Sequence, residues 1–182
     1  ESEKKVLAAL DEIKDKVDVL CVCDQMKYGC ITDAVRDKIC ALGKDGLKII
    51  VDSRDRIGLY ENVTVKPNDI EAARAAGESD PAKCAEILSQ KTGSPAIVTC
   101  GADGCVIFEN GKAAHIDANK KLSGETDICG AGDTFLSAAA AFTAAGKALA
   151  EAAVYANAAS CVTVHKVGMT GTATREEICA IL

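Results

Sequence analysis

Short apolar runs alternate along this chain with longer segments whose apolar residues recur at helical spacing. The runs cover residues 17–24, 47–52 and 96–100, and helical patterns lie around and between them. Strands that are apolar throughout are typical of a parallel sheet that is covered on both faces. The alternation therefore predicts an α/β fold with three layers, in which a mainly parallel sheet lies between two layers of helices.

Capping and turn residues set the expected boundaries of the elements. Thr32, Asn68, Asp80 and Thr174 each stand before a helical pattern and can cap it. Helices are expected over residues 2–16, 32–42, 69–77, 81–91, 131–145, 147–164 and 174–182. A short strand and turn is expected over residues 63–69. Residues 105–116 predict a hairpin, because Asn110-Gly111 suits a type I′ turn.

The size and charge of the chain bound its class. Its 182 residues fit a single domain, residues 1–182, with a core of its own. A net charge of −6 argues against a nucleic-acid or membrane surface, which would need clustered Lys and Arg. We expect neither a membrane span nor a signal peptide, because no apolar run has the required length and setting. A cytoplasmic protein is therefore expected.

The ten cysteines do not form a metal-binding pattern. They include no Cys-x-x-Cys pair, and the chain has only two histidines, His115 and His165. A zinc site would show paired ligands at short, fixed spacing. Most of the cysteines lie within apolar runs, where cysteine behaves as a small buried hydrophobe. We expect reduced core thiols in a reducing compartment, and treat both histidines as ordinary polar residues.

Polar residues follow several of the predicted strands. Asp24, Asp52, the Lys66-Pro67-Asn68 turn and Gly101 all stand where an apolar run ends. Ligands of parallel sheets collect at the carboxyl ends of the strands. These residues are therefore expected to converge on one edge of the sheet.

The stretch Asp127–Phe135, "DICGAGDTF", opens an alanine-rich helix with Gly-Ala-Gly. Glycine is a costly way to start a helix, unless something approaches the bare backbone closely. The free amides of Gly130, Ala131, Gly132 and Asp133 can bind an anion such as phosphate. Asp133 would repel a resting phosphate, but beside a transferring phosphoryl group it can accept the proton of an attacking hydroxyl. The alternative is that Asp133 only favours the helix dipole.

The same stretch closely resembles the C-terminal signature of ribokinase-type carbohydrate kinases, the phosphofructokinase-B family. Three further segments resemble motifs of that family in the same order. "KPNDIE" resembles its Asn-x-x-Glu motif, "VTCGADG" its nucleotide loop, and "YANAAS" with "HKVGMTGTATREEI" its closing helix and following loop. Together the matches cover almost all of residues 17–182. The resemblance implies a three-layer α/β/α ribokinase-like fold and a kinase activity that uses ATP and Mg²⁺.

The resemblance also implies residue roles. Asp133 would be the catalytic base, and Gly130, Ala131 and Gly132 would form the anion hole with it. Asn68 and Glu71 would organise magnesium and phosphates. The nucleotide site would be lined by Thr99, Gly101, Ala102, Asp103, Gly104 and Asn157. Asp127, with backbone oxygens near Gly168 and with Thr172, would hold a monovalent cation such as K⁺.

Simpler explanations exist for some of these residues. Asn68 and Thr99 could merely cap a helix or pair with backbone, and Glu71 could be a solvated helix acid. Asn157 has no obvious capping task within its alanine-rich helix. These alternatives remain open at the level of sequence.

The sequence departs from the family pattern at several points. Lys66 stands where Thr or a similar small residue is usual, and Ile128-Cys129 replaces the common Thr-Thr beside the cation site. Family members also carry an N-terminal portion that starts the sheet, supplies most sugar contacts and often adds a β lid. The resemblance implies that this chain lacks that portion and corresponds to the C-terminal, nucleotide-binding side. A sheet truncated in this way would expose an edge, which predicts a homodimer or poor solubility.

Within the family, residues 51–69 and 156–172 look most like the kinase half of the bifunctional heptose-phosphate enzymes, although residues 23–35 alter the usual Asp-Tyr-x-Lys-Gly order. The implied function is transfer of the γ-phosphoryl group of ATP to a hydroxyl of a sugar or sugar phosphate. Two alternatives are a catalytically idle nucleotide-binding fragment and a vitamin or nucleoside kinase of the same fold.

Overall fold

The computed structural model describes residues 1–119 and 123–182, which form six strands in one sheet, ordered β1-β2-β3-β4-β5-β6. The first four strands pair in parallel, and the last two are antiparallel. The strands are β1 (Val19–Asp24), β2 (Lys48–Ser53), β3 (Thr64–Val65), β4 (Ala96–Thr99), β5 (Cys105–Glu109) and β6 (Lys112–Ile116). The predicted mainly parallel sheet is confirmed.

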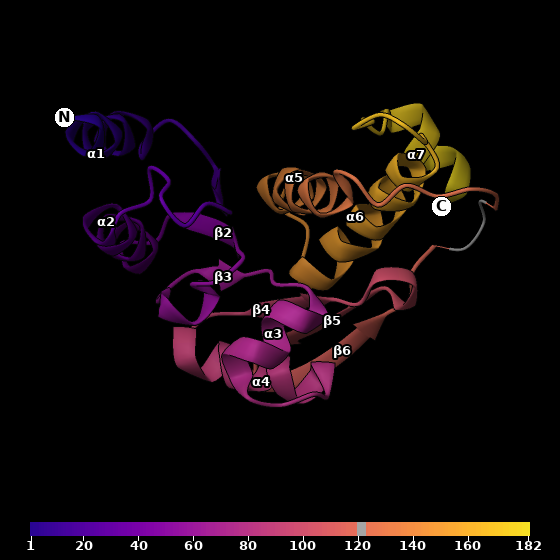
Figure 1. The fold of residues 1–182 in the computed structure, drawn as a ribbon, viewed down its shortest axis with the longest axis horizontal. Helices are drawn as coiled ribbons and strands as arrows, with labels where there is room; N and C mark the ends of the chain where they lie inside the picture. Colours follow the sequence, from indigo (N-terminus) through magenta and orange to yellow (C-terminus); the bar gives the residue numbers. More distant parts are fainter. Residues whose placement is uncertain (120–122) are drawn as a thin grey trace.

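Helices cover both faces of this sheet. They are α1 (Ser2–Ile13), α2 (Asp33–Lys44), α3 (Asp69–Ala76), α4 (Pro81–Thr92), α5 (Ala131–Ala144), α6 (Leu149–Val164) and α7 (Arg175–Ile181). Buried side chains of α1 to α4 form one core with the sheet, those of α5 and α6 form a second, and α7 packs on α6. Figure 1 shows α5, α6 and α7 grouped on one side, apart from α3 and α4. The predicted three-layer α/β/α arrangement is confirmed.

Alternating strand residues divide between the two cores. Val51 and Val98 pack with α1 to α4, whereas their neighbours Ile50 and Ile97 pack with α5 and α6. Successive side chains of a strand point to opposite faces, so a strand covered on both faces must be apolar at every position. This explains the continuous apolar runs of the sequence.

The predicted caps and hairpin turn are confirmed. Thr32, Asn68, Asp80 and Thr174 each accept a backbone N–H of the helix that follows, and α3 and α7 begin with complete capping boxes. Asn110 and Gly111 have φ angles of 53° and 75°, as a type I′ turn requires.

Two local features differ from the expectation. The first helix ends at Ile13 and not at residue 16. A 3₁₀ turn, η1 (Ile57–Leu59), follows β2 where no element was predicted. Ile57 and Tyr60 are fully buried, and the Tyr60 hydroxyl donates to Asp24 at 3.0 Å. These long-range contacts fix the turn, and no local pattern could reveal them.

The cysteines correct another expectation. Only Cys84 and Cys105 of the ten are buried, and five are exposed. Burial raises the pKa of Cys105 to about 12. Cys21 and Cys23 lie within an apolar run, but both are exposed on β1, a strand at the edge of the sheet. The apolar pattern predicted a strand correctly, yet it could not reveal that this strand lies at the edge of the sheet, where two of its cysteines are exposed.

No helix in the described part of the chain is both long and apolar enough to cross a membrane.

Candidate functional site

Helix α5 begins with backbone that no side chain caps. Gly130 adopts a left-handed conformation with φ of 78°, and Gly132 and Asp133 in the first turn are exposed. First-turn amides have no acceptor within their own helix. The turn is anchored from α6, because Ser160 donates to the Ala131 carbonyl at 3.0 Å. The Ala131 N–H donates to the Ile128 carbonyl at 3.1 Å. The predicted helix start is therefore on the surface, where a ligand can reach the backbone at Gly132 and Asp133.

A buried ion pair lies beneath this helix start. Lys66 Nζ is 2.9 Å from Asp52 Oδ2, and the two residues are 2% and 6% exposed. A Cβ built on Gly132 would lie 3.9 Å from each of these two atoms. Gln25 also donates to Asp52, at 3.0 Å. The ends of β2 and β3 thus support the first turn of α5 directly.

Cys23 borders the same cluster. Partial burial of its thiol, and next the negative charges of Asp133 and Asp52, raise the pKa of Cys23, although the residue as a whole is exposed. The Asp133 carboxylate is therefore close to the ends of β1 and β2, as convergence of the strand ends requires.

Asp24, the remaining strand-end carboxylate, is fully engaged within the protein. It accepts hydrogen bonds from Ser53 at 2.9 Å, from Tyr60 at 3.0 Å and from the Arg56 guanidinium. Burial acts to raise the pKa of Asp24, but the hydrogen bonds from these three donors outweigh it and lower the pKa below its ordinary value. Asp24 therefore holds the backbone after β2 in place and leaves no free oxygen for a ligand.

Asn68 and Glu71 form the capping box that opens α3. Asn68 Oδ1 accepts the Glu71 N–H at 2.8 Å, and Glu71 Oε2 accepts the Asn68 N–H at 3.0 Å. Asn68 also pairs as an isolated β-bridge with Thr99, whose N–H donates to Pro67 at 3.0 Å. The capping role considered for Asn68 is real, and it does not exclude a role toward a ligand, since both side chains stand at the carboxyl edge of the sheet.

The predicted nucleotide loop is a tight turn, η2 (Gly101–Asp103), between β4 and β5. Gly101 and Gly104 have φ angles of 55° and 88°, while Gly101, Ala102 and Asp103 are exposed. A Cβ on Gly104 would lie 2.1 Å from the Ile116 carbonyl oxygen. Only glycine fits there, because the chain leaving β6 crosses at this point.

Asn157 has a clear structural contact. Its buried side-chain amide donates to the carbonyls of Ile116 and Asp117, at 3.3 and 3.2 Å. Gly104 and Asn157 therefore both touch the segment that follows β6. The structure brings these two predicted nucleotide residues together around one stretch of backbone.

Asp127 ties two loops together. Its carboxylate accepts the N–H groups of Cys129, at 3.0 Å, and Gly168, at 3.1 Å. These hydrogen bonds lower the pKa of Asp127. Asp127 therefore lies beside Gly168 as predicted. At Thr172, however, the carbonyl oxygen accepts a hydrogen bond from the Lys166 ammonium.

The donors for a metal ion are sparse in residues 1–119 and 123–182. These residues contain no cluster of three His, Cys, Asp or Glu side chains that could hold a metal ion. Mg²⁺ binds through few carboxylates and keeps several waters, so the pair of exposed Asn68 and partly buried Glu71 fits it. At the expected monovalent-cation site, amide donors reach both Asp127 oxygens and Lys166 holds the Thr172 carbonyl, so these atoms fit a cation only if those contacts rearrange.

A series of contacts links the predicted residues along one edge of the sheet. Gly132 lies over Lys66, which is two residues before Asn68, and Asn68 pairs with Thr99 at the start of the η2 loop. Sequence reasoning expected this convergence but did not find the Asp52–Lys66 pair. A signal was present, since both residues stand at the ends of predicted strands. Gln25 gave no signal.

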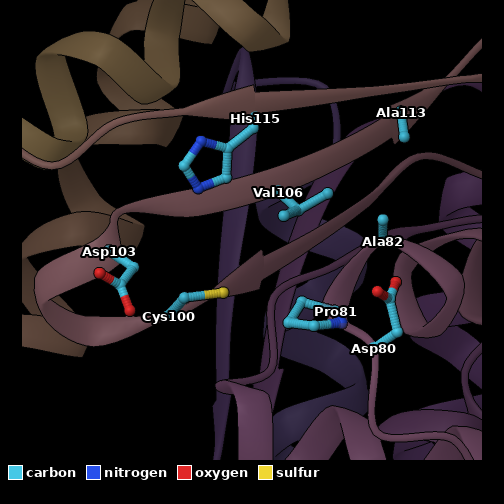
Figure 2. Close-up of a pocket in the computed structure, with 8 residues that line it drawn as sticks. All are labelled: Asp80, Pro81, Ala82, Cys100, Asp103, Val106, Ala113 and His115. Carbon is cyan, nitrogen blue, oxygen red and sulfur yellow. The ribbon is translucent and has the colours of Figure 1, made fainter.

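A cavity of about 450 Å³ lies elsewhere, on the α4 side of the sheet. Figure 2 shows it between the start of α4 and strands β5 and β6, with Asp103 and His115 at one end and Asp80 at the other. It shares only Asp103 with the predicted site residues. His115 is half exposed there and lies 3.3 Å from Asp117.

Comparisons with known proteins agree with the fold. The family model described as "pfkB family carbohydrate kinase" matches residues 59–175, which is more than half of the chain. "Bifunctional protein HldE" of Gluconobacter oxydans is 38% identical over 170 residues, covering 88% of this chain. The match spans only 35% of that relative, so this chain corresponds to about a third of its length.

Solved structures show the same fold. A ribokinase-type protein of Escherichia coli, solved with ATP and Mg²⁺, superposes with a TM-score of 0.75 at 20% identity, over 94% of this chain and 60% of its own. Phosphofructokinase-2 of Escherichia coli, solved with potassium, gives a TM-score of 0.75 at 18% identity, over 96% of this chain and 60% of its own. These likenesses confirm the ribokinase-like fold.

Proposed function

We propose, from the premise that the chain belongs to the pfkB family of carbohydrate kinases, that it carries the nucleotide-binding and phosphoryl-transfer side of an ATP-dependent sugar kinase. The acceptor is a hydroxyl group of a sugar or sugar phosphate. The heptose-phosphate class is the first to test, because the HldE relatives are similar over most of this chain.

The observation that supports this proposal best is the open start of α5. Exposed amides at Gly132 and Asp133 meet the edge of the sheet next to Lys66, Asn68 and the η2 loop. Amides at a helix start bind anions, and in a kinase they stabilise the charge on the transferring group. A nucleotide held along the η2 loop would bring its γ-phosphate toward this helix start.

In the reaction, the acceptor hydroxyl oxygen forms a bond to the γ-phosphorus while the bond between that phosphorus and the leaving ADP oxygen breaks. Asp133 accepts the hydroxyl proton, and its exposed position allows an acceptor to approach. The amides at the start of α5, above all those of Gly132 and Asp133, hold the equatorial oxygens of the transferring group. The remaining chemistry is positioning, which suits a site built on helix and strand ends.

Asn68 and Glu71 would organise Mg²⁺ through water, and the metal would neutralise charge on the β- and γ-phosphates when bound. Asp127, with the backbone near Gly168 and with Thr172, would hold a monovalent cation. The complexes of the two Escherichia coli proteins with Mg²⁺ and ATP and with potassium support these assignments. Thr99, residues 101–104 and Asn157 would line the nucleotide.

Two further parts of the proposal concern the setting of the enzyme. The use of ATP and the expected reduced state of the cysteines both fit a cytoplasmic enzyme. The outer edge of β1 has no paired strand in the described residues, and a second copy of the chain could cover it to form a homodimer. Sedimentation measures the latter directly, and a well-behaved monomer would contradict it.

A second candidate function is nucleotide binding without catalysis. The chain covers 35% of the HldE relative, and the acceptor contacts in such a protein can come from the remaining part. Sugar-dependent ATP consumption by this chain alone would exclude this candidate. Binding of Mg-ATP with no consumption would support it.

The decisive test is Asp133→Asn in the intact protein. We expect kcat to fall by about a hundredfold to ten-thousandfold, because the proton acceptor is lost, with little change in nucleotide affinity. The matched control is Asp33→Asn, which removes a first-turn acid from α2. If Asp133 only favours the helix dipole, both variants lose similar stability and both keep their turnover.

A further inference from the structure

The Asp52–Lys66 ion pair has no task in the proposed proton transfer or in the anion hole. The side chain of Lys66 is 3% exposed and that of Asp52 is 9% exposed, and their charged atoms are 2.9 Å apart. Burying such a pair is costly, and apolar side chains of similar size are often as stable or more so. The pair is therefore poorly explained as a device for stability alone.

The location of the pair suggests a different role. Both charged atoms lie 3.9 Å from the point where a Gly132 side chain would begin, directly under the helix start that would hold the phosphoryl group. The carboxylates of Asp133 and Asp52 already place negative charge here, and both act on the neighbouring Cys23 thiol. A phosphoryl group adds further negative charge. Lys66 is the cation within this cluster that can offset it.

The donor geometry of Lys66 leaves it free to act on a ligand. A lysine ammonium has three N–H donors. Within the described residues Lys66 forms an ion pair with Asp52, and the Gln25 side-chain amide donates a hydrogen bond to Asp52. Because residue 132 is glycine, no side chain separates the ammonium from the first turn of α5.

We propose that Lys66 supplies positive charge to the γ-phosphoryl group held at the α5 start, and that Asp52 and Gln25 are its positioning residues. Lys66 takes no part in proton transfer, and the hydroxyl proton passes to Asp133. This inference rests on the proposed kinase function and adds a residue to it.

Nucleotide binding provides a test that needs no acceptor. Calorimetric titrations of the intact protein with Mg-ATP and with Mg-ADP compare the two affinities in wild type and in Lys66→Met. We expect the variant to bind Mg-ATP about tenfold or more weakly, because a charge-assisted hydrogen bond to the γ-phosphate is lost, and to bind Mg-ADP almost unchanged. Lys38→Met, which removes a lysine paired with Asp11 between α2 and α1, is the matched control and should change neither affinity.

A double variant separates the electrostatic role from a structural one. Lys66→Met leaves the buried Asp52 carboxylate unpaired and should lower Tm. Asp52→Asn combined with Lys66→Met removes both charges and should restore most of the lost Tm. We expect the double variant still to bind Mg-ATP weakly. Its kcat should stay about a hundredfold below wild type, with a much smaller change in the KM for the acceptor.

The outcomes distinguish this inference from the function on which it rests. If wild type binds neither nucleotide, both fail together. If wild type binds both nucleotides and Lys66→Met keeps the wild-type ratio of the two affinities, the kinase assignment stands and the role of Lys66 is wrong. Recovery of Mg-ATP binding and of kcat in the double variant would likewise reduce the pair to a structural one.

Discussion

Helices α3 and α5 begin near the same edge of the sheet, and their starts are built in opposite ways. Asn68 and Glu71 close the α3 start with a complete capping box, as Thr174 and Glu177 do for α7. At α5 the N-cap is Gly130 in a left-handed conformation, and no side chain accepts the first amides. A capped start satisfies its amides internally and favours stability. An uncapped start on the surface keeps its amides for a ligand.

Substitution at Gly132 should break the open start with the largest effect. Its φ is not positive and a Cβ would meet nothing closer than 3.9 Å, so Gly132→Ala folds normally. Alanine favours helix by up to about 1 kcal/mol over glycine, so Tm should hold or rise. The added methyl group occupies space needed by the phosphoryl group, and kcat should fall by about a hundredfold.

The control for this prediction is Gly58→Ala in the η1 turn. The added methyl group would lie at an ordinary contact distance of 3.8 Å from the Ala75 side chain. Thermal melts and steady-state kinetics on both variants give the result. A Gly132→Ala protein with wild-type turnover would contradict the idea that the α5 start holds the transferring group.

Removing one cap from each of the two capping boxes, at α3 and at α7, should have effects of intermediate size. Asn68→Ala and Thr174→Ala each remove one cap and should each cost about 1 kcal/mol of unfolding free energy. Only Asn68 is proposed to organise Mg²⁺. Asn68→Ala should therefore also raise the Mg²⁺ concentration needed for half-maximal turnover, whereas Thr174→Ala should leave that concentration unchanged. Equal behaviour of the two variants in the Mg²⁺ titration would reduce Asn68 to a cap.

The smallest expected effect is the pH dependence of the α7 start. The Thr174 N–H donates to Glu177 at 2.8 Å, and this hydrogen bond, followed by that from Lys166, lowers the pKa of Glu177. A lowered pKa in the folded state contributes stability that is present above the unfolded value of about 4.3 and is lost as pH falls through the folded value. Glu177→Gln should therefore flatten the fall in Tm below that pH.

Thermal melts between acid and neutral pH measure this effect, with Glu176→Gln as a control for removing a neighbouring exposed carboxylate. A Glu177→Gln profile parallel to wild type would show that the α7 capping box contributes nothing to acid sensitivity.

Much of the candidate site followed from sequence because its parts are local. The Asn68 cap, the Asn110-Gly111 turn and the glycine-rich start of α5 depend on neighbouring residues, and each was predicted at its position. The catalytic and ligand-binding roles remain proposals, because they depend on groups that the chain must bind. The exposed cysteines were mispredicted, since the cover over a strand face depends on distant helices.

The sequence by itself determined the order of strands and helices, the caps and the tight turns, because hydrophobic period and backbone preference act over a few residues. Only the tertiary structure decided which polar residues meet. In the folded protein, Tyr60 next to η1 donates a hydrogen bond to Asp24, and Asn157 donates to the backbone at the end of β6. The Asp52–Lys66 pair lies beneath Gly132. Such partners lie far apart in the chain, and burial makes each charged group find a partner in whatever the packing brings near.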